Sequence, residues 1–340
     1  MVKRPLYVPY HRLDTTPNIV VDGAANHHTQ LTLSHWPGAK TPPELKDDLS
    51  AGIVFNYLAD EQLHLPVEAV SNNHFDEDGL VGIWSLLEPD EALERQDSLI
   101  DIAAAGDFGT YKDRDSARVS FVLRAWADAQ QSPLSGWVFE QPYLDQCAVL
   151  YEELLPRLDK IVDRISSFKN YWQTQDKLLD KSEQALRKGE MTLVEHPQAD
   201  LAVVTLPEPR KKDRERELRS PWNELVQEMA IHNQTGMMRV LLKQEKRYCL
   251  YFRYETWVQY VSRQLTPRID LEPFCSMLNQ QERHGAVWTF DDLEALQPKL
   301  SFTGALESDI PAADFTQQLT TFLATAAAAS GSRADATPAP

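Results

Sequence analysis

The chain has 340 residues, of which 42% are hydrophobic and 25% charged, an ordinary globular composition whose length predicts two domains. Its formal net charge of −17 repels the nucleic-acid backbone and argues against general DNA or RNA binding. It lacks both an apolar run long enough to span a membrane and a secretory signal pattern, and its three scattered cysteines exclude a cysteine-based zinc site. We therefore expect a cytoplasmic protein.

The first element expected in chain order is a buried strand over residues 18–22, which ends at Asp22. Three histidines follow it, His27, His28 and His35, and with Asp22 they concentrate metal-capable groups in a short segment. Each histidine alone is as compatible with a structural or surface role as with ligation. The segment is therefore a candidate source of metal ligands.

The next elements predict an α/β arrangement. A Thr-Pro-Pro-Glu start at Thr41 predicts a helix to about residue 58, and an apolar run over 67–70 predicts a second strand. Further helices are expected from residue 80 to 87, from 90 to 105 and from 117 to 131. Strand and helix thus alternate, which predicts a mainly parallel sheet flanked by helices.

The rest of the chain predicts a helical connector and a second, smaller α+β lobe. Strands are expected over 201–206, 247–254, 256–262 and 286–290, and helices over 222–232 and 271–279. After about Thr325 the Ala-rich and then Ser/Gly/Pro-rich tail has too little apolar content to pack, which predicts disorder. The expected divisions are a metal-site lobe 1–135, a connector 136–190, a second lobe 191–312 and a C-terminal segment 313–340.

The string His74-Phe75-Asp76-Glu77-Asp78-Gly79 has the form H-x-D-x-D-G and follows the predicted strand at 67–70. One imidazole and two carboxylates, each two residues apart, can converge on a cation if the turn is tight. Mixed nitrogen and oxygen ligands suit Mn²⁺, Fe²⁺ or Zn²⁺. The alternative is an acidic turn in which Asp78 caps the following helix.

This string resembles the first metal motif of the DHH phosphoesterase superfamily. The resemblance implies that His74, Asp76 and Asp78 ligate a divalent metal, usually manganese, and that a bridging water attacks phosphorus. Asp107 stands where a later family aspartate lies. The nearest counterpart of the family's Asp-His-His motif is Asp22 with His27 and His28, which lies upstream, and the glycine-rich substrate motif is absent from the C-terminal half of the sequence.

The leading hypothesis is a metal-dependent hydrolase of a phosphoester or phosphoanhydride that acts on a small phosphorylated substrate or an oligonucleotide end. The expected cofactor is Mn²⁺, with Fe²⁺, Zn²⁺ or Mg²⁺ as alternatives. The candidate metal ligands are His74, Asp76, Asp78, Asp22, His27, His28 and Asp107. Of these, His74, Asp76, Asp78 and His28 are candidate catalytic residues. A non-catalytic ligand-binding or scaffold protein and an amide or C–N hydrolase are the alternatives, and a homodimer is left open.

Asn73 and Arg253 are candidates for substrate contact. Arg253 lies in an aromatic, buried-looking strand, where a charge needs a partner. A substrate phosphate is one partner, and Glu255 on the same strand face is the other. The basic stretch 210–219 predicts a solvated face, with a phosphate-binding rim as the alternative.

Overall fold

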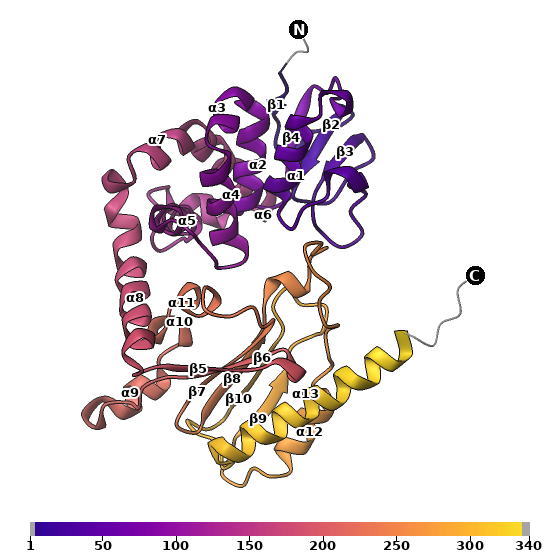
Figure 1. The fold of residues 1–340 in the computed structure, drawn as a ribbon. Helices are drawn as coiled ribbons and strands as arrows, with labels where there is room; N and C mark the ends of the chain where they lie inside the picture. The colour runs from indigo at the N-terminus through magenta and orange to yellow at the C-terminus, as the bar shows by residue number, and fades with distance from the viewer. Residues whose placement is uncertain (1–3, 335–340) are drawn as a thin grey trace. The chain divides into compact units, whose positions relative to one another are not determined.

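The computed structural model describes residues 4–334 and divides into two compact units (Figure 1). The first unit comprises the chain up to Lys177 together with the segment Val258–Arg263, which we call the strap. The second comprises Leu178–Trp257 and the chain from Gln264 onward. The helices between 136 and 190, expected as a connector, are therefore shared between the units. Across residues 4–334, no helix is long and apolar enough to cross a membrane.

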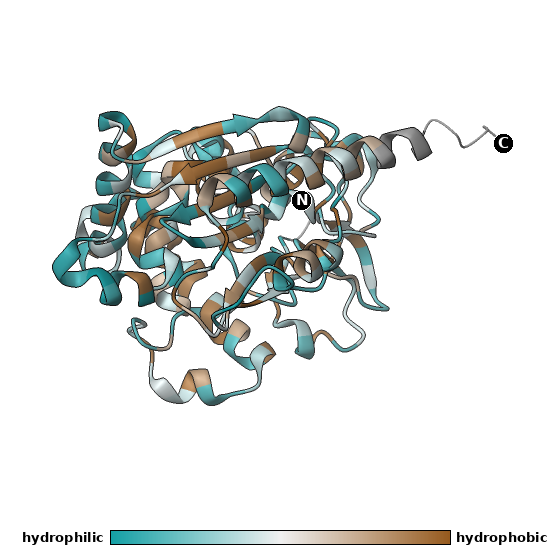
Figure 2. Ribbon diagram, turned by 90° about the horizontal axis from the view of Figure 1, so that it is seen from below, coloured by the Kyte–Doolittle hydropathy of each residue, from teal (hydrophilic) through white to brown (hydrophobic). Residues whose placement is uncertain are grey.

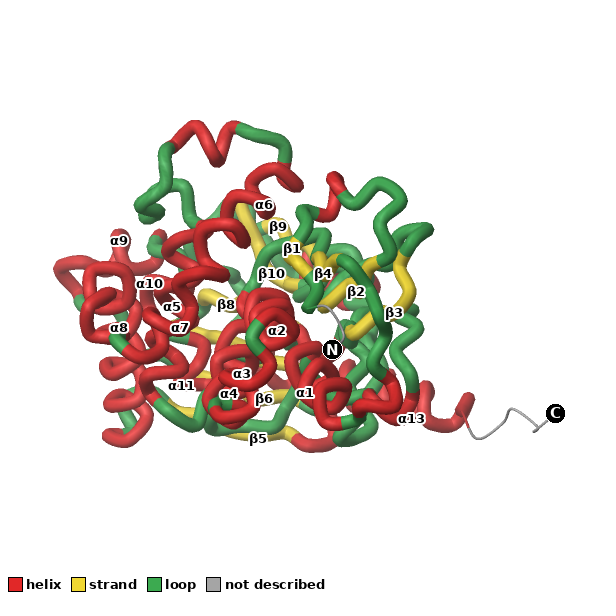
Figure 3. Tube along the Cα trace, turned by 90° about the horizontal axis from the view of Figure 1, so that it is seen from above, coloured by secondary structure: helices red, strands yellow, loops and turns green. Residues whose placement is uncertain are grey.

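The first unit contains a four-stranded, fully parallel sheet in the order β1-β4-β2-β3. Its strands are β1 (Leu6–Tyr7), β2 (Asn18–Val21), β3 (Thr29–Leu33) and β4 (Ala69–Ser71). Its helices are α1 (Ser50–Ala59), α2 (Glu77–Leu87), α3 (Pro89–Glu94), α4 (Gln96–Asp107), α5 (Arg114–Ala127), α6 (Tyr143–Leu154), α7 (Leu158–Asp163) and the first part of α8 (Lys169–Lys188). Figure 3 shows the strands side by side in this order, with α1 and α2 beside them. The predicted parallel sheet flanked by helices is confirmed.

Strand β3 is absent from the sequence prediction, and it changes the path of the chain. Because β2 and β3 run parallel, residues 22–28 must carry the chain from the carboxyl end of β2 back to the start of β3. Thr29, at that start, pairs with Asn18 at the start of β2, and the Thr29 hydroxyl donates to the Asn18 side chain at 2.9 Å. The segment before β3 therefore lies at the opposite sheet edge from Asp22.

The helix expected from Thr41 begins instead at Ser50, after a short 3₁₀ turn at Pro43–Leu45. Thr41 caps no helix. Its hydroxyl donates to the Ser34 carbonyl at 2.7 Å and accepts from the Ser34 amide at 3.1 Å. Because the Thr41 hydroxyl is already bonded to the backbone of Ser34, it cannot also cap a helix, and the helix therefore does not begin at Thr41.

The second unit contains a six-stranded sheet in the order β5-β6-β7-β8-β10-β9, in which only the β6–β7 pair is parallel. Its strands are β5 (Thr192–His196), β6 (Leu201–Thr205), β7 (Arg239–Gln244), β8 (Arg247–Phe252), β9 (Val287–Phe290) and β10 (Lys299–Thr303). Its helices, besides the end of α8, are α9 (Arg214–Arg219), α10 (Trp222–Leu225), α11 (Glu228–His232), α12 (Glu272–Asn279) and α13 (Ala312–Ala334). The predicted α+β character is confirmed.

Two apolar cores cover the two faces of this sheet. One contains side chains of α12 and α13, and the other contains side chains of α8, α10 and α11. Successive side chains of β7 point to opposite faces of the sheet, as in any strand. Leu241 therefore packs in the first core, and Val240 and Leu242 pack in the second. Apolar residues accordingly colour the strands of the sheet in Figure 2.

Two further predictions differ from the structure. The strand expected over 256–262 is a 3₁₀ turn at Tyr254–Thr256 followed by the irregular strap. Its Val, Tyr and Trp residues have high strand propensity, but propensity reflects side-chain packing more than backbone preference. Disorder was expected after about Thr325, yet α13 continues to Ala334 because alanine is the strongest helix former. Residues 335–340 of the predicted tail lie outside the described residues.

Candidate metal centre

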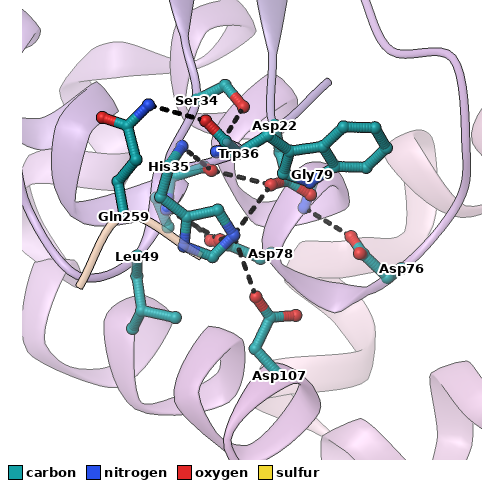
Figure 4. Close-up of polar contacts among 12 residues, drawn as sticks. Asp22, Ser34, His35, Trp36, Leu49, Asp76, Asp78, Gly79, Asp107 and Gln259 are labelled. Atoms are coloured by element: carbon teal, nitrogen blue, oxygen red, sulfur yellow. Dashed lines mark hydrogen bonds and ion pairs between the residues drawn. The ribbon is translucent and has the colours of Figure 1, made fainter. Parts of the chain in front are cut away.

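The carboxyl ends of three parallel strands place polar residues at one edge of the first sheet. Asp22 follows β2 directly, His35 lies two residues after β3, and His74 lies three residues after β4. The turn after β4 leads into α2, whose N-terminus contributes two aspartates, and Asp107 is the last residue of α4. Figure 4 shows the side chains of Asp22, His35, Asp78 and Asp107 pointing toward one another.

Five side chains at this edge form two metal-capable triads that share Asp22. In each triad, Asp22–His74–Asp76 and Asp22–His35–Asp78, the possible ligand atoms lie within 4.8 Å of one another. In the first, His74 Nε2 lies 2.6 Å from Asp76 Oδ2 and 3.2 Å from Asp22 Oδ2. In the second, His35 Nε2 lies 3.3 Å from Asp22 Oδ1 and 3.9 Å from Asp78 Oδ2. The two oxygens of Asp22 thus face different histidines.

Asp107 joins the second triad, because its Oδ2 lies 3.4 Å from His35 Nε2. Asp22 is fully buried and adopts a left-handed backbone conformation, with φ of +48°. Aspartate tolerates this conformation better than most residues. The Asp22 carboxylate also accepts a hydrogen bond from the Ser50 hydroxyl at 2.7 Å, which ties it to the start of α1.

The two aspartates of the motif each support a helix. Asp76 is the N-cap of α2, and its Oδ1 accepts from the Gly79 amide at 2.8 Å. Asp78 accepts from the Ser50 and Ala51 amides, both at 2.7 Å, at the N-terminus of α1. The predicted alternative, that Asp78 caps the following helix, is therefore wrong, because Asp76 has that role. A carboxylate at a helix N-terminus is favoured by the exposed amides and the helix dipole.

The orientation of His35 is set by a hydrogen bond of 2.6 Å between its Nδ1 and the Asp48 carbonyl oxygen. A carbonyl can only accept, so Nδ1 carries a proton and Nε2 is the atom that faces the carboxylates. A bond of this type, from the far ring nitrogen to a backbone carbonyl, fixes the tautomer and ring orientation of metal-binding histidines.

Burial and crowding shift the pKa values of the cluster. Burial, and then the nearby Asp22 charge, raise the pKa of Asp78 to about 7, and burial also raises the pKa values of Asp76 and Asp107. Burial opposes ionisation of His35, but its hydrogen bond to Asp22 prevails and raises the His35 pKa to about 9. The metal-free cluster therefore retains protons that a cation could displace.

Several buried polar atoms of the cluster make no hydrogen bond within residues 4–334. Among them are Asp22 Oδ2 and Asp107 Oδ2, which each lie near a histidine nitrogen, and His74 Nδ1. Buried polar atoms are normally paired, and each of these belongs to a residue type that binds divalent cations. Four aspartates and two histidines in so small a volume also need compensating positive charge. The cluster could therefore hold a metal ion.

The structure brings together five of the predicted ligands and separates His27 and His28 from them. Both histidines are exposed, in the segment that precedes β3 at the opposite sheet edge. The prediction that they join the site is wrong because the chain after Asp22 returns to the start of β3 and carries both histidines away from the end of β2. His35 takes their place. The alternation of TQLTL in residues 29–33 is the signal that predicts β3 and puts His35 at its carboxyl end.

The two candidate substrate contacts have structural partners. Asn73 accepts from the Ala24 amide at 2.8 Å, which closes the turn after β2. Arg253 is buried in the second unit, forms an ion pair with Glu255 and donates to the Thr235 carbonyl at 3.0 Å. These contacts match the ion-pair alternative for Arg253. In the basic stretch 210–219, exposed arginines form ion pairs with neighbouring glutamates, as on a solvated face.

A family model described as a family of unknown function, DUF6687, matches residues 3–334, and the chain belongs to that family. No curated protein and no solved structure matches the chain.

Proposed function

We propose that this member of the DUF6687 family is a metal-dependent hydrolase that cleaves a phosphoester or phosphoanhydride. The observation that carries the proposal is the position of Asp22, whose two carboxylate oxygens each face one histidine-containing triad. A carboxylate shared in this way is suited to bridge two cations. The resemblance of the His74–Gly79 string to the first DHH phosphoesterase motif supports the same chemistry.

The residues present fit two divalent cations. His74 and Asp76 would hold one with Asp22, and His35, Asp78 and Asp107 would hold the other with the same aspartate. Two imidazoles and four carboxylates form a mixed nitrogen and oxygen donor set, which suits Mn²⁺, Fe²⁺ or Zn²⁺. We propose Mn²⁺. When bound, such cations lower the pKa of coordinated water and neutralise charge on phosphoryl oxygens.

The exposure of each side chain indicates which residues of the cluster a substrate could reach. The side chains of Asp22 and His35 are fully buried, whereas those of His74 and Asp76 keep 15% and 24% of their surface exposed. A substrate would therefore approach from the His74 side, where the Trp36 ring lies 4.8 Å from the imidazole.

The test uses the full chain, loaded with Mn²⁺, and assays bis-p-nitrophenyl phosphate and short oligonucleotides. Asp22→Asn preserves shape but removes the bridging charge, so we expect the rate to fall on the order of 100-fold or more. His28→Ala is the matched control, because His28 is an exposed histidine from the same segment, and we expect it to retain full activity.

Two results would contradict the proposal. If the Asp22→Asn protein hydrolyses these substrates at the rate of the unaltered protein, the cluster is not the site. If a protein shown to contain Mn²⁺ by elemental analysis cleaves none of these substrates, a non-catalytic metal-binding protein is favoured.

A further inference from the structure

The strap, Val258–Arg263, is distant in sequence from the metal centre yet belongs to the same compact unit. We propose that the strap holds His35 in its metal-binding orientation, with Gln259 and Asp48 as the positioning residues. The inference rests on the proposed function for the role of the cation. The orientation of the imidazole itself can be measured without a metal.

Gln259 secures the backbone of His35 and of the loop that follows it, as far as Ala39. Its amide donates to the His35 carbonyl at 2.7 Å, and its side-chain Nε2 donates to the carbonyls of Trp36 and Ala39 at 2.8 and 3.3 Å. Figure 4 shows Gln259 beside the His35–Trp36 backbone. Residues 36–42 form no helix or strand, so their backbone carbonyls need partners from elsewhere in the chain.

Asp48 connects the strap to the imidazole. Its Oδ1 accepts from the amides of Val261 and Ser262, at 2.7 and 2.9 Å. The carbonyl oxygen of the same residue accepts from His35 Nδ1 at 2.6 Å. The strap therefore holds both partners of the bond that orients the ring, His35 through Gln259 and Asp48 through the two amides.

The strap should act mainly on one triad. The hydrogen bonds of Gln259, Val261 and Ser262 to residues 4–334 go to the backbone at 35–39 and to Asp48, and none reaches His74 or the turn before α2. Loss of the strap contacts would free the His35 ring directly, whereas it would act on His74 only indirectly, through the Trp36 ring that lies 4.8 Å from its imidazole. Partners that orient a metal ligand typically change metal affinity by about 10- to 100-fold.

The test measures Mn²⁺ binding to the full chain by titration with electron paramagnetic resonance of the free ion. In Asp48→Ala and Gln259→Ala we expect the cation at the His35 triad to bind about tenfold more weakly, and the affinity for the other cation to change less. Asp48→Asn keeps an Oδ1 acceptor for both strap amides and should behave as the unaltered protein. Gln264→Ala is the matched control, because Gln264 is exposed and forms no hydrogen bond with the described residues.

A second measurement separates this inference from the proposed function. Nitrogen-15 NMR of the imidazoles in metal-free protein should show His35 protonated at Nδ1, and this signal should change in Asp48→Ala and persist in Asp48→Asn. Unchanged His35 signals together with unchanged Mn²⁺ affinities in Asp48→Ala and Gln259→Ala would overturn the role of the strap. Equal weakening of both cations would also overturn it. If the unaltered protein binds no Mn²⁺, the proposed function fails, and the NMR comparison still decides whether the strap orients His35.

Discussion

At the scale of single residues, Asn72 holds the turn that carries His74. Its Oδ1 accepts from the His74 amide at 3.2 Å, and its Nδ2 donates to the Tyr151 hydroxyl at 3.0 Å. Gly79 packs against this pair. A Cβ at position 79 would lie 2.3 Å from Asn72 Nδ2 and 2.6 Å from the Tyr151 hydroxyl. The glycine of the motif is therefore required by space rather than by its backbone angles.

Gly79→Ala should destabilise the protein although alanine favours helix. Alanine gains about 1 kcal/mol in a helix interior, but inserting a methyl group into a filled site costs about 1–3 kcal/mol. We expect a net loss in the free energy of unfolding, measured by urea denaturation, and weaker Mn²⁺ binding because the His74 turn moves. Gly136→Ala is the control, because a Cβ there meets nothing within 4 Å. A Gly79→Ala protein as stable as the unaltered one would refute the packing argument.

At the scale of elements, three helices are joined behind the metal centre. Glu77, between the two aspartates of the motif, accepts from the Ser120 hydroxyl at 2.7 Å and from Arg124 Nε at 3.1 Å. Arg124 also donates to the Gly106 carbonyl at 2.6 Å, directly before Asp107. A Cβ at position 106 would lie 2.5 Å from the Glu77 Cβ, so α4 and α2 approach closely at this point. This contact sets the distance of Asp107 from the other residues of the cluster.

Arg124→Met should loosen this junction. Of its two side-chain partners within residues 4–334, the buried Glu77 carboxylate would keep Ser120 and lose Arg124, and losing a hydrogen bond to a charged group costs about 1–3 kcal/mol. We expect that loss in the free energy of unfolding, together with lower Mn²⁺ affinity. Arg95→Met is the matched control, because its partner Asp163 is 55% exposed, unlike the buried Glu77, and the pair should contribute about 1 kcal/mol or less. Equal effects of the two substitutions would contradict a specific role for Arg124.

Local sequence patterns predict the elements that depend on residues close together in the sequence. The buried apolar runs predict β2 and β4. The polar turn before α2 correctly predicts that His74, Asp76 and Asp78 follow the end of a strand. The short, half-exposed β3 was missed, and His27 and His28 were misplaced as a consequence. The contacts of Gln259 with the His35 loop were beyond any local pattern. They depend on pairing across 223 residues, which neither propensity nor periodicity encodes.

At the scale of the whole molecule, a cation bound in the buried acidic cluster, as we propose, would stabilise the folded protein. A ligand that binds only the folded state stabilises it by about 2.7 kcal/mol at a concentration of 100 times its Kd. We therefore expect EDTA to lower the melting temperature and Mn²⁺ to restore it, measured by calorimetry. Because the pKa of Asp78 is raised to about 7, protons compete with the cation below that pH, so the Mn²⁺ effect should be larger at pH 8 than at pH 6. Asp22→Asn should abolish the effect, and a melting temperature indifferent to EDTA would count against a bound cation.

The strap also has a consequence for the order in which the protein is made. The triad Asp22–His74–Asp76 is encoded by the first quarter of the chain, whereas Gln259 follows Trp36 by 223 residues. At a translation rate of about 5–20 residues per second, Gln259 is synthesised roughly 10–45 s later. On the proposed roles, a nascent chain can bind one cation long before His35 is held for the second. The second cation site would then be completed only after the ribosome has translated the strap.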